Sequence, residues 1–222
     1  KQVECPLTGK VTVDEVKQAG IPRTREQAAA TYVRGHSLLD LYTAAENNEF
    51  GGLVEMKAVT ADPTQVLLAL REHAPIIGST AMTTAKGNIC AKTGKLLLSR
   101  LKIRWILFGN QESTPPRAHM HACVVKTISF NIVLSFSAYF QCCSHRPGKV
   151  DNGGNGNLDA SRAFTHADLP RKLLIRVSKK ILAGFARQGM DIPKDTKFLL
   201  ALKAIYGTID SGDLWYSLIM NK

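Results

Sequence analysis

Two basic clusters are the first groups in this sequence whose side chains could do chemistry. Both are interleaved with apolar residues, which predicts folded surfaces rather than charged tails. The whole chain of 222 residues has 29 basic and 18 acidic residues, a formal net charge of +11. This excess favours a polyanionic partner, most commonly nucleic acid, although a merely basic globular protein would show it too. The clusters contain Lys86, Lys92, Lys95, Arg100, Lys102 and Arg104, and then Arg171, Lys172, Arg176, Lys179 and Lys180.

A lone aspartate, Asp159, stands in the stretch NLDASRAFTHADL of residues 157–169. An aspartate at the end of a strand is a common turn residue. The run KVDNGGNGN that precedes it has the composition of a loop, because glycine and asparagine are unfavourable in strands. Residue type alone therefore leaves the role of Asp159 open.

Histidines and cysteines form a third group of candidates. The stretch HMHAC would place its two histidines and its cysteine on one face of a strand, where they could bind zinc. The spacing matches no known zinc-knuckle pattern, so a zinc-binding module is the less favoured alternative. The residues concerned are His119, His121, Cys123, Cys142, Cys143 and His145.

The cysteines and the apolar runs indicate the cellular compartment and whether the chain contacts a membrane. The five cysteines are odd in number and irregularly spaced, and no signal peptide is visible, so we expect a reduced intracellular compartment. The longest apolar run, 128–140, is interrupted by serine and asparagine. It falls short of the roughly 18–20 residues that span a bilayer, so no membrane partner is expected.

The elements that must position these residues follow from periodicity and turn residues. Apolar residues at helical spacing predict a helix over Glu26–Asn48, or two helices if Gly35 interrupts it. A short strand is expected over Val54–Val59. The pair Asp62-Pro63 predicts the start of a helix, because proline suits the first helical turn. The extended segments 76–86 and 96–108 then predict a β-hairpin with a basic tip.

The second half predicts a helix over Thr127–Phe140, a loop over 141–157, and a short strand and turn over 158–164. Leu173–Val177 is expected to form a strand, Thr196–Tyr206 is another apolar segment, and DLWYSLIMNK begins a helix. The mixture predicts an α+β fold without internal repeats.

In this order, the segments resemble the reverse transcriptase of copia-type LTR retrotransposons. LDASRAFTHADLP is similar to the family's L-D-V-x-x-A-F-L-H-G-x-L, and LLALKAIYGTIDSGDLWYS to L-x-K-A-L-Y-G-L-K-Q-A-x-R-x-W-Y. NEFGGLVEMKAV, SRLKIRWILFGNQE and CVVKTISFNIVLSFSA carry weaker similarity. The resemblance covers roughly Tyr42 to Lys222. It implies a right-hand polymerase, with fingers over 42–140, a Gly/Asn-rich loop or insertion over 141–157, and the start of an incomplete palm over 158–222. Residues 1–41 are an N-terminal extension.

The resemblance implies an RNA-directed DNA polymerase that joins nucleotides by two-metal catalysis, with two Mg²⁺ ions held by carboxylates. Asp159 would be the first catalytic, metal-binding carboxylate. The backbone amides of the next four residues would bind the triphosphate. Phe164 would lie under the sugar and exclude a 2′-hydroxyl, although plain core packing would also suit it. The four amides belong to Ala160, Ser161, Arg162 and Ala163.

Further nucleotide contacts are implied on the hairpin and near the end of the chain. Arg104 would bind the triphosphate, because a guanidinium donates two parallel hydrogen bonds. Lys86 is a candidate for a second phosphate contact and Lys102 its rival, although a solvated surface charge is the better interpretation of Lys86. Tyr206-Gly207 would be the turn that closes over nucleotide and template.

The implied partners are an RNA or DNA template–primer, deoxynucleoside triphosphates and the remaining Pol domains (thumb, RNase H and integrase). The implied location is a cytoplasmic particle or the nucleus. The family also has a second aspartate pair in a Y-x-D-D hairpin, and no Asp-Asp pair occurs in these residues. Ile209 and Asp210 stand where the family commonly has Lys-Gln, so a cationic contact would be lost. We therefore expect little or no polymerase activity from this chain alone, and the alternative is an inactive nucleic-acid-binding remnant.

Overall fold

The computed structural model describes residues 7–112 and 163–220. Several predictions from the sequence lie outside these residues and are not addressed by the structure. They are the helix over Thr127–Phe140, the loop over 141–157, the zinc alternative, and the site residues Asp159, Ala160, Ser161 and Arg162.

A five-stranded mixed sheet organises the described residues, in the strand order β3-β7-β6-β4-β5. The central pair, β6 and β4, is parallel, and the other neighbours are antiparallel. The α+β class predicted from the sequence is therefore confirmed. The strands are β3 (Val59–Thr60), β4 (Ile76–Ile89), β5 (Leu96–Leu107), β6 (Asp168–Arg176) and β7 (Phe198–Lys203).

The central part of the sheet is covered on both faces. On one face pack α7 (Lys179–Arg187), the π-helix η1 (Asn47–Gly51) and α4 (Gly52–Glu55), and on the other packs α5 (Pro63–Arg71). The ring of Phe185 lies 4.8 Å from that of Phe50 and 5.1 Å from that of Trp105. Leu173, Leu174 and Ile175 of β6 are all buried, as expected of a strand covered on both sides.

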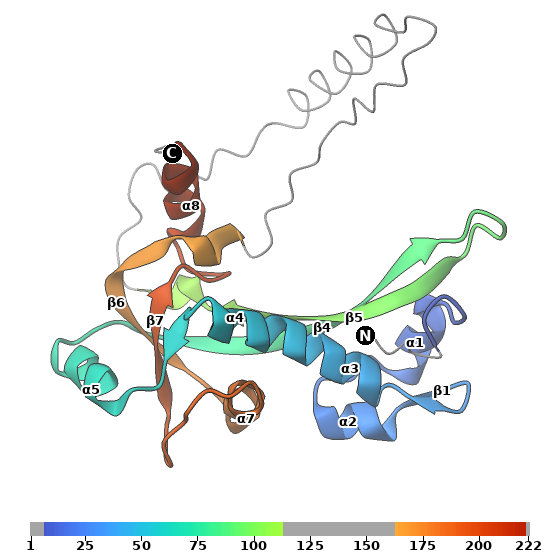
Figure 1. Cartoon of the computed structure of the whole chain (residues 1–222), viewed down its shortest axis with the longest axis horizontal. Helices are drawn as coiled ribbons and strands as arrows, with labels where there is room; N and C mark the ends of the chain where they lie inside the picture. Colours follow the sequence, from blue (N-terminus) through green and yellow to red (C-terminus); the bar gives the residue numbers. More distant parts are fainter. Residues whose placement is uncertain (1–6, 113–162, 221–222) are drawn as a thin grey trace, which may run out of the picture.

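The hairpin of β4 and β5 extends well beyond the rest of the sheet (Figure 1). The N-terminal elements pack along one face of this extension, where Leu98, Leu101 and Ile103 of β5 join a second buried cluster. These elements are α1 (Val13–Ala19), α2 (Arg25–Ala30), β1 (Tyr32–Val33), β2 (His36–Ser37) and α3 (Leu39–Glu46).

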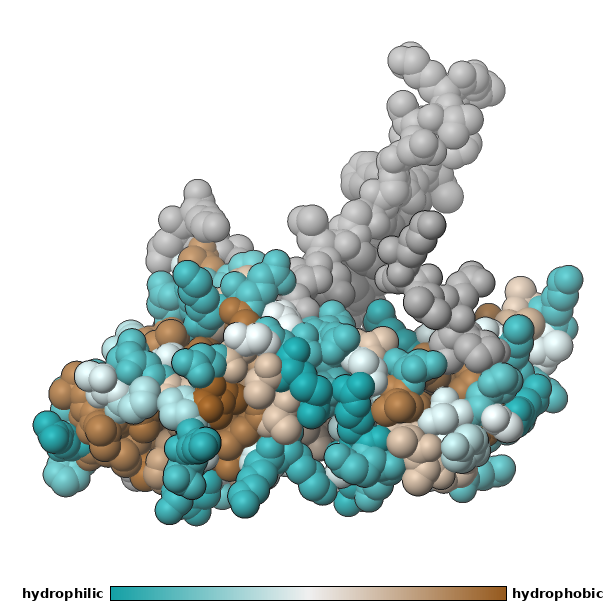
Figure 2. Space-filling view, turned by 60° about the horizontal axis from the view of Figure 1, so that its bottom comes forward, coloured by the Kyte–Doolittle hydropathy of each residue, from teal (hydrophilic) through white to brown (hydrophobic). Residues whose placement is uncertain are grey.

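Three short elements complete the described chain: η2 (Gly109–Gln111), η3 (Ala163–His166) and α8 (Ser211–Met220). Within the described residues, no helix is long and apolar enough to cross a membrane. Figure 2 shows apolar side chains gathered at the end of the molecule formed by α5, where Leu67 and Leu68 are about half exposed.

The predicted elements are largely confirmed. The hairpin, the strand within 173–177, the C-terminal helix and the helix that begins at Asp62-Pro63 all form, and the Asp62 carboxylate accepts a hydrogen bond from the Thr64 amide. The interval 26–48 holds two helices, as the Gly35 alternative allowed, separated by a hairpin whose turn places Arg34 and Gly35 at positive φ.

One predicted strand is wrong, and one helix was not predicted. The strand over Val54–Val59 is wrong, because α4 continues to Glu55 with Leu53 in the core, and only Val59–Thr60 pairs with β7. Of the strand and turn over 158–164, only the last two residues lie within the described part of the chain, where they begin a 3-10 helix. Helix α7 was not predicted, although Ser178 caps it and Ile181 and Phe185 have helical spacing.

Candidate functional site

Three of the predicted site residues meet at one place. The Phe164 and Tyr206 rings lie edge to face, with centroids 4.8 Å apart, and the Arg104 guanidinium carbon lies 5.5 Å from the Tyr206 centroid. These residues come from η3, the segment after β7, and β5. Edge-to-face rings and a cation over an aromatic face are both favourable contacts, so the three side chains hold one another in place.

The turn at Tyr206-Gly207 is held against the end of β5. The Leu107 amide donates a hydrogen bond of 2.9 Å to the Tyr206 carbonyl oxygen. Gly207 has φ +96, and a Cβ added there would lie 2.0 Å from the Leu107 carbonyl oxygen. A Cβ on Gly109 would in turn lie 2.0 Å from the Gly207 carbonyl oxygen. Two backbones approach so closely here that only glycine fits on either side.

A row of cations follows one face of the hairpin from this turn. Arg104 pairs with Met82, Lys102 with Thr84, and Arg100 with Lys86. Because side chains alternate along a strand, the four basic residues share a face, while Leu101, Ile103 and Trp105 are buried on the other. We call Lys86, Arg100, Lys102 and Arg104 the basic row.

The charges of the basic row act on one another. Burial lowers the pKa of Lys102, and the neighbouring Arg104 and Arg100 lower it further, while Glu49 acts in the opposite direction. A phosphate placed along the row would relieve this repulsion, because it would bring negative charge to adjacent cations.

The two lysines that are candidates for a phosphate contact lie at different distances from Arg104. Lys102 is two residues from Arg104 on the same face, whereas Lys86 lies beside Arg100, roughly 14 Å along the hairpin from Arg104 at about 3.4 Å per residue. Lys102 therefore suits a ligand held by Arg104 better than Lys86 does. Ala163 is the first residue of η3, directly before Phe164.

Glu49 is a site residue that the sequence analysis did not single out. Its Oε1 accepts a hydrogen bond of 2.9 Å from the Trp105 amide, the residue after Arg104 on β5. Glu49 lies in the π-helix, a rare element that often marks functional sites. It also lines a small cavity with Phe164 and Tyr206. The volume of this cavity is about 20 Å³, enough for about one water molecule. A larger ligand would therefore lie on the open surface.

We expect Glu49→Ala to lower the free energy of unfolding by about 1–3 kcal/mol, because it leaves the Trp105 amide without its acceptor. Glu49→Gln keeps an oxygen at the same position and should cost less than half as much. Urea denaturation followed by tryptophan fluorescence measures both variants. Equal losses would show that the charge, and not the hydrogen bond, matters.

Arg171, a member of the second basic cluster, forms ion pairs with two carboxylates. It contacts the buried Glu112 and, at 3.1 Å, Asp210 Oδ1. Burial raises the pKa of Glu112, and Arg171 counteracts this. The Glu112 carboxylate also accepts a hydrogen bond of 3.4 Å from the Ile209 amide. Asp210, at a position where the resemblance implies a glutamine, therefore joins an ion-pair cluster that ties the 206–210 turn to β6.

The fold and site define an α+β protein with a long β-hairpin, one basic face and an arginine–tyrosine–phenylalanine cluster at its base. This chain matches no family model, no curated protein and no solved structure. Its function is therefore inferred from the residues themselves.

Proposed function

We propose that this chain is the nucleotide-facing part of an RNA-directed DNA polymerase of the copia type, with the hairpin as its fingers and the strands around β6 as the start of its palm. In this proposal the basic row binds phosphates of a triphosphate and a template–primer. Phe164, held edge-on by Tyr206, lies under the sugar and leaves no room for a 2′-hydroxyl.

The meeting of Arg104, Phe164 and Tyr206 is the observation that carries this proposal. The residues come from segments up to about a hundred positions apart, and each was a candidate on separate sequence motifs. Their convergence beside the basic row is what a nucleotide site requires: cations for the phosphates next to an apolar surface for the sugar.

Mg²⁺ is the cofactor that the proposal implies. Its expected ligand, Asp159, lies outside the described residues, and no group of three potential ligands occurs within them. Of two nearby acids, Glu49 holds the Trp105 amide and Asp168 pairs with Lys203. The described residues do not supply a donor set for the metal, so no step is assigned to it here.

The proposal is tested first by binding of a fluorescent RNA–DNA template–primer between 50 and 200 mM salt. Removing a phosphate contact reduces the slope of log affinity against log salt by about one. We expect this reduction for Arg104→Ala and for Lys102→Ala. Lys194→Ala, an exposed lysine away from the hairpin, should leave the slope unchanged. Equal effects of all three variants would argue against a specific role of the basic row.

The second candidate function is an inactive nucleic-acid-binding remnant, supported by the basic row, which could bind phosphates without a metal ion. Primer extension that disappears in Asp159→Ala supports the polymerase. Salt-sensitive binding that persists without Mg²⁺, with no extension, supports the remnant.

A further inference from the structure

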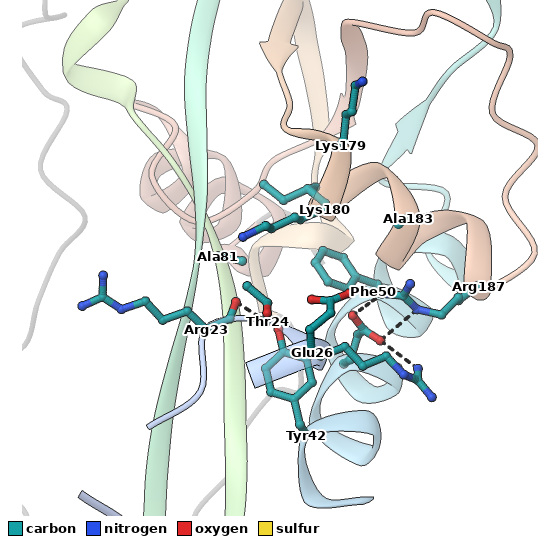
Figure 3. A pocket seen from close by; sticks show the side chains of 13 residues that line it. Arg23, Thr24, Glu26, Tyr42, Phe50, Ala81, Lys179, Lys180, Ala183 and Arg187 are labelled. Atoms are coloured by element: carbon teal, nitrogen blue, oxygen red, sulfur yellow. Dashed lines mark hydrogen bonds and ion pairs between the residues drawn. The ribbon is translucent and has the colours of Figure 1, made fainter. Parts of the chain in front are cut away.

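A pocket of about 210 Å³ opens between α2, α3 and the first turns of α7 (Figure 3). Ala81 of β4 also lines it. Ala81 pairs with Trp105, so it faces the side of the hairpin opposite to Arg104, which pairs with Met82. The pocket is therefore separate from the site proposed for the nucleotide.

The lining of this pocket is strongly cationic. Five basic side chains line the pocket, together with only two carboxylates, those of Glu26 and Glu46. In Figure 3 the Lys180 side chain reaches across the pocket towards Ala81. The five basic residues are Arg23, Arg25, Lys179, Lys180 and Arg187.

Both carboxylates already accept hydrogen bonds from residues of this chain. The buried Glu46 accepts two hydrogen bonds from Arg187, of 2.6 and 3.1 Å, and lies 3.5 Å from Arg25. Glu26 is held by its own backbone amide and by Thr24, and these hydrogen bonds lower its pKa. The two arginines on Glu46 are largely neutralised, which leaves Arg23, Lys179 and Lys180 as the pocket's excess charge. Lys180 also lies close enough to Glu26 to lower the pKa of that carboxyl.

Lys179 and Lys180 occupy the first two positions of α7, a helix with no acidic residue in its first turn. Positive charge at this end is unfavourable, because the helix dipole is itself positive there. The first amides of a helix also have no acceptor within it, and Ser178 accepts only from the Ile181 amide. The Lys180 side chain, which points into the pocket in Figure 3, and the positive end of the helix dipole both favour an anion here.

We propose that this pocket binds a phosphoryl anion, with Lys180 as its principal cationic contact. The volume lies below the roughly 300–1,000 Å³ of pockets that hold drug-sized ligands, so it suits one or two phosphoryl groups and not a whole nucleotide. The group can belong to a free phosphate or diphosphate, or to the backbone of a nucleic acid strand. The inference does not depend on the polymerase proposal, since its residues lie on the other side of the hairpin.

Calorimetric titration of the full chain with sodium pyrophosphate, without divalent metal, tests the proposal. We expect the double variant Lys179→Ala/Lys180→Ala to weaken binding at least tenfold. A matched control, Lys92→Ala/Lys95→Ala, removes the same charge from exposed positions at the tip of the hairpin and should change the affinity less than twofold. The titration is repeated in the Lys102→Ala/Arg104→Ala background, where pyrophosphate bound by the basic row on the opposite face does not contribute to the signal.

Two further readouts complete the test. Without ligand, the Lys179/Lys180 variant should melt no earlier than the wild type, because it removes positive charge from a helix N-terminus. A short oligothymidylate that displaces pyrophosphate identifies backbone phosphate as the source of the group, and failure to displace it identifies a free phosphate. Absence of pyrophosphate binding, or equal weakening by the Lys179/Lys180 variant and its matched control, overturns the proposal.

Discussion

Replacing Gly207 with alanine is expected to lower the free energy of unfolding by about 3–6 kcal/mol and to weaken template–primer binding. The backbone at Gly207 has φ +96, a conformation that costs an L-residue about 1–2 kcal/mol. The new Cβ would also lie 2.0 Å from the Leu107 carbonyl oxygen, which is backbone and cannot rotate away. The turn must therefore move, at an overpacking cost of about 1–3 kcal/mol and a lost hydrogen bond worth about 1 kcal/mol.

Gly20 provides a matched control for the backbone contribution. It has φ +94, nearly that of Gly207, but a Cβ added there meets nothing within 4 Å. Gly20→Ala should therefore cost only the conformational part, about 1–2 kcal/mol. Urea denaturation followed by the fluorescence of the buried Trp105 measures both variants. If the two lose the same stability, the close approach of the turn to β5 contributes nothing.

The Gly207 result also bears on the candidate site, because the same turn carries Tyr206. A displaced turn would move the Tyr206 ring away from Phe164 and Arg104, which it contacts at 4.8 and 5.5 Å. Gly20 lies at the end of α1, away from this cluster, so Gly20→Ala should leave template–primer affinity unchanged. A loss of affinity in the Gly207 variant alone would link the glycine to the site as well as to stability.

The elements that local patterns determine were the ones predicted from the sequence. The extended segments 76–86 and 96–108 indicated the hairpin, and Asp62-Pro63 marked a helix start that needs no distant partner. The interval 26–48 shows the limit of periodicity, since the turn at Arg34 and Gly35 divides a continuous apolar pattern into two helices. A helical period shows which residues share a face, and it does not show whether the chain reverses between them.

The site depends on contacts that no local pattern contains. Arg104 and Tyr206 are about a hundred residues apart, and only their match to separate motifs made both candidates. Glu49 could not be found this way, because its role is to pair with a backbone amide of β5 that becomes its neighbour only in the folded chain. The need for glycine at both Gly109 and Gly207 likewise arises from two backbones that meet across the fold.

Arg171→Met should cost about 3–5 kcal/mol of unfolding free energy at pH 7, because it leaves two carboxylates close together without their cation. The Glu112 side chain is fully buried, so water cannot replace the lost partner. Arg171→Lys keeps the charge but loses the planar fork and should cost only about 1 kcal/mol. Adding Glu112→Gln to the methionine variant removes one buried charge and should restore part of the loss.

The loss in Arg171→Met should depend on pH with a definite sign. The pKa of Glu112 is raised from its ordinary value of 4.5, mainly by burial, and Arg171 counteracts this. Removing Arg171 raises that pKa further, so the folded variant takes up a proton at a higher pH than the unfolded chain does. A group with a raised folded-state pKa contributes stability at low pH that is lost as pH rises through that pKa. The difference in unfolding free energy between wild type and Arg171→Met should therefore shrink as pH falls from 7 towards 4.5, as urea titrations at several pH values would measure. A difference that stays constant or grows over this range would show that Glu112 stays ionised without Arg171, and that Arg171 does not set its charge state.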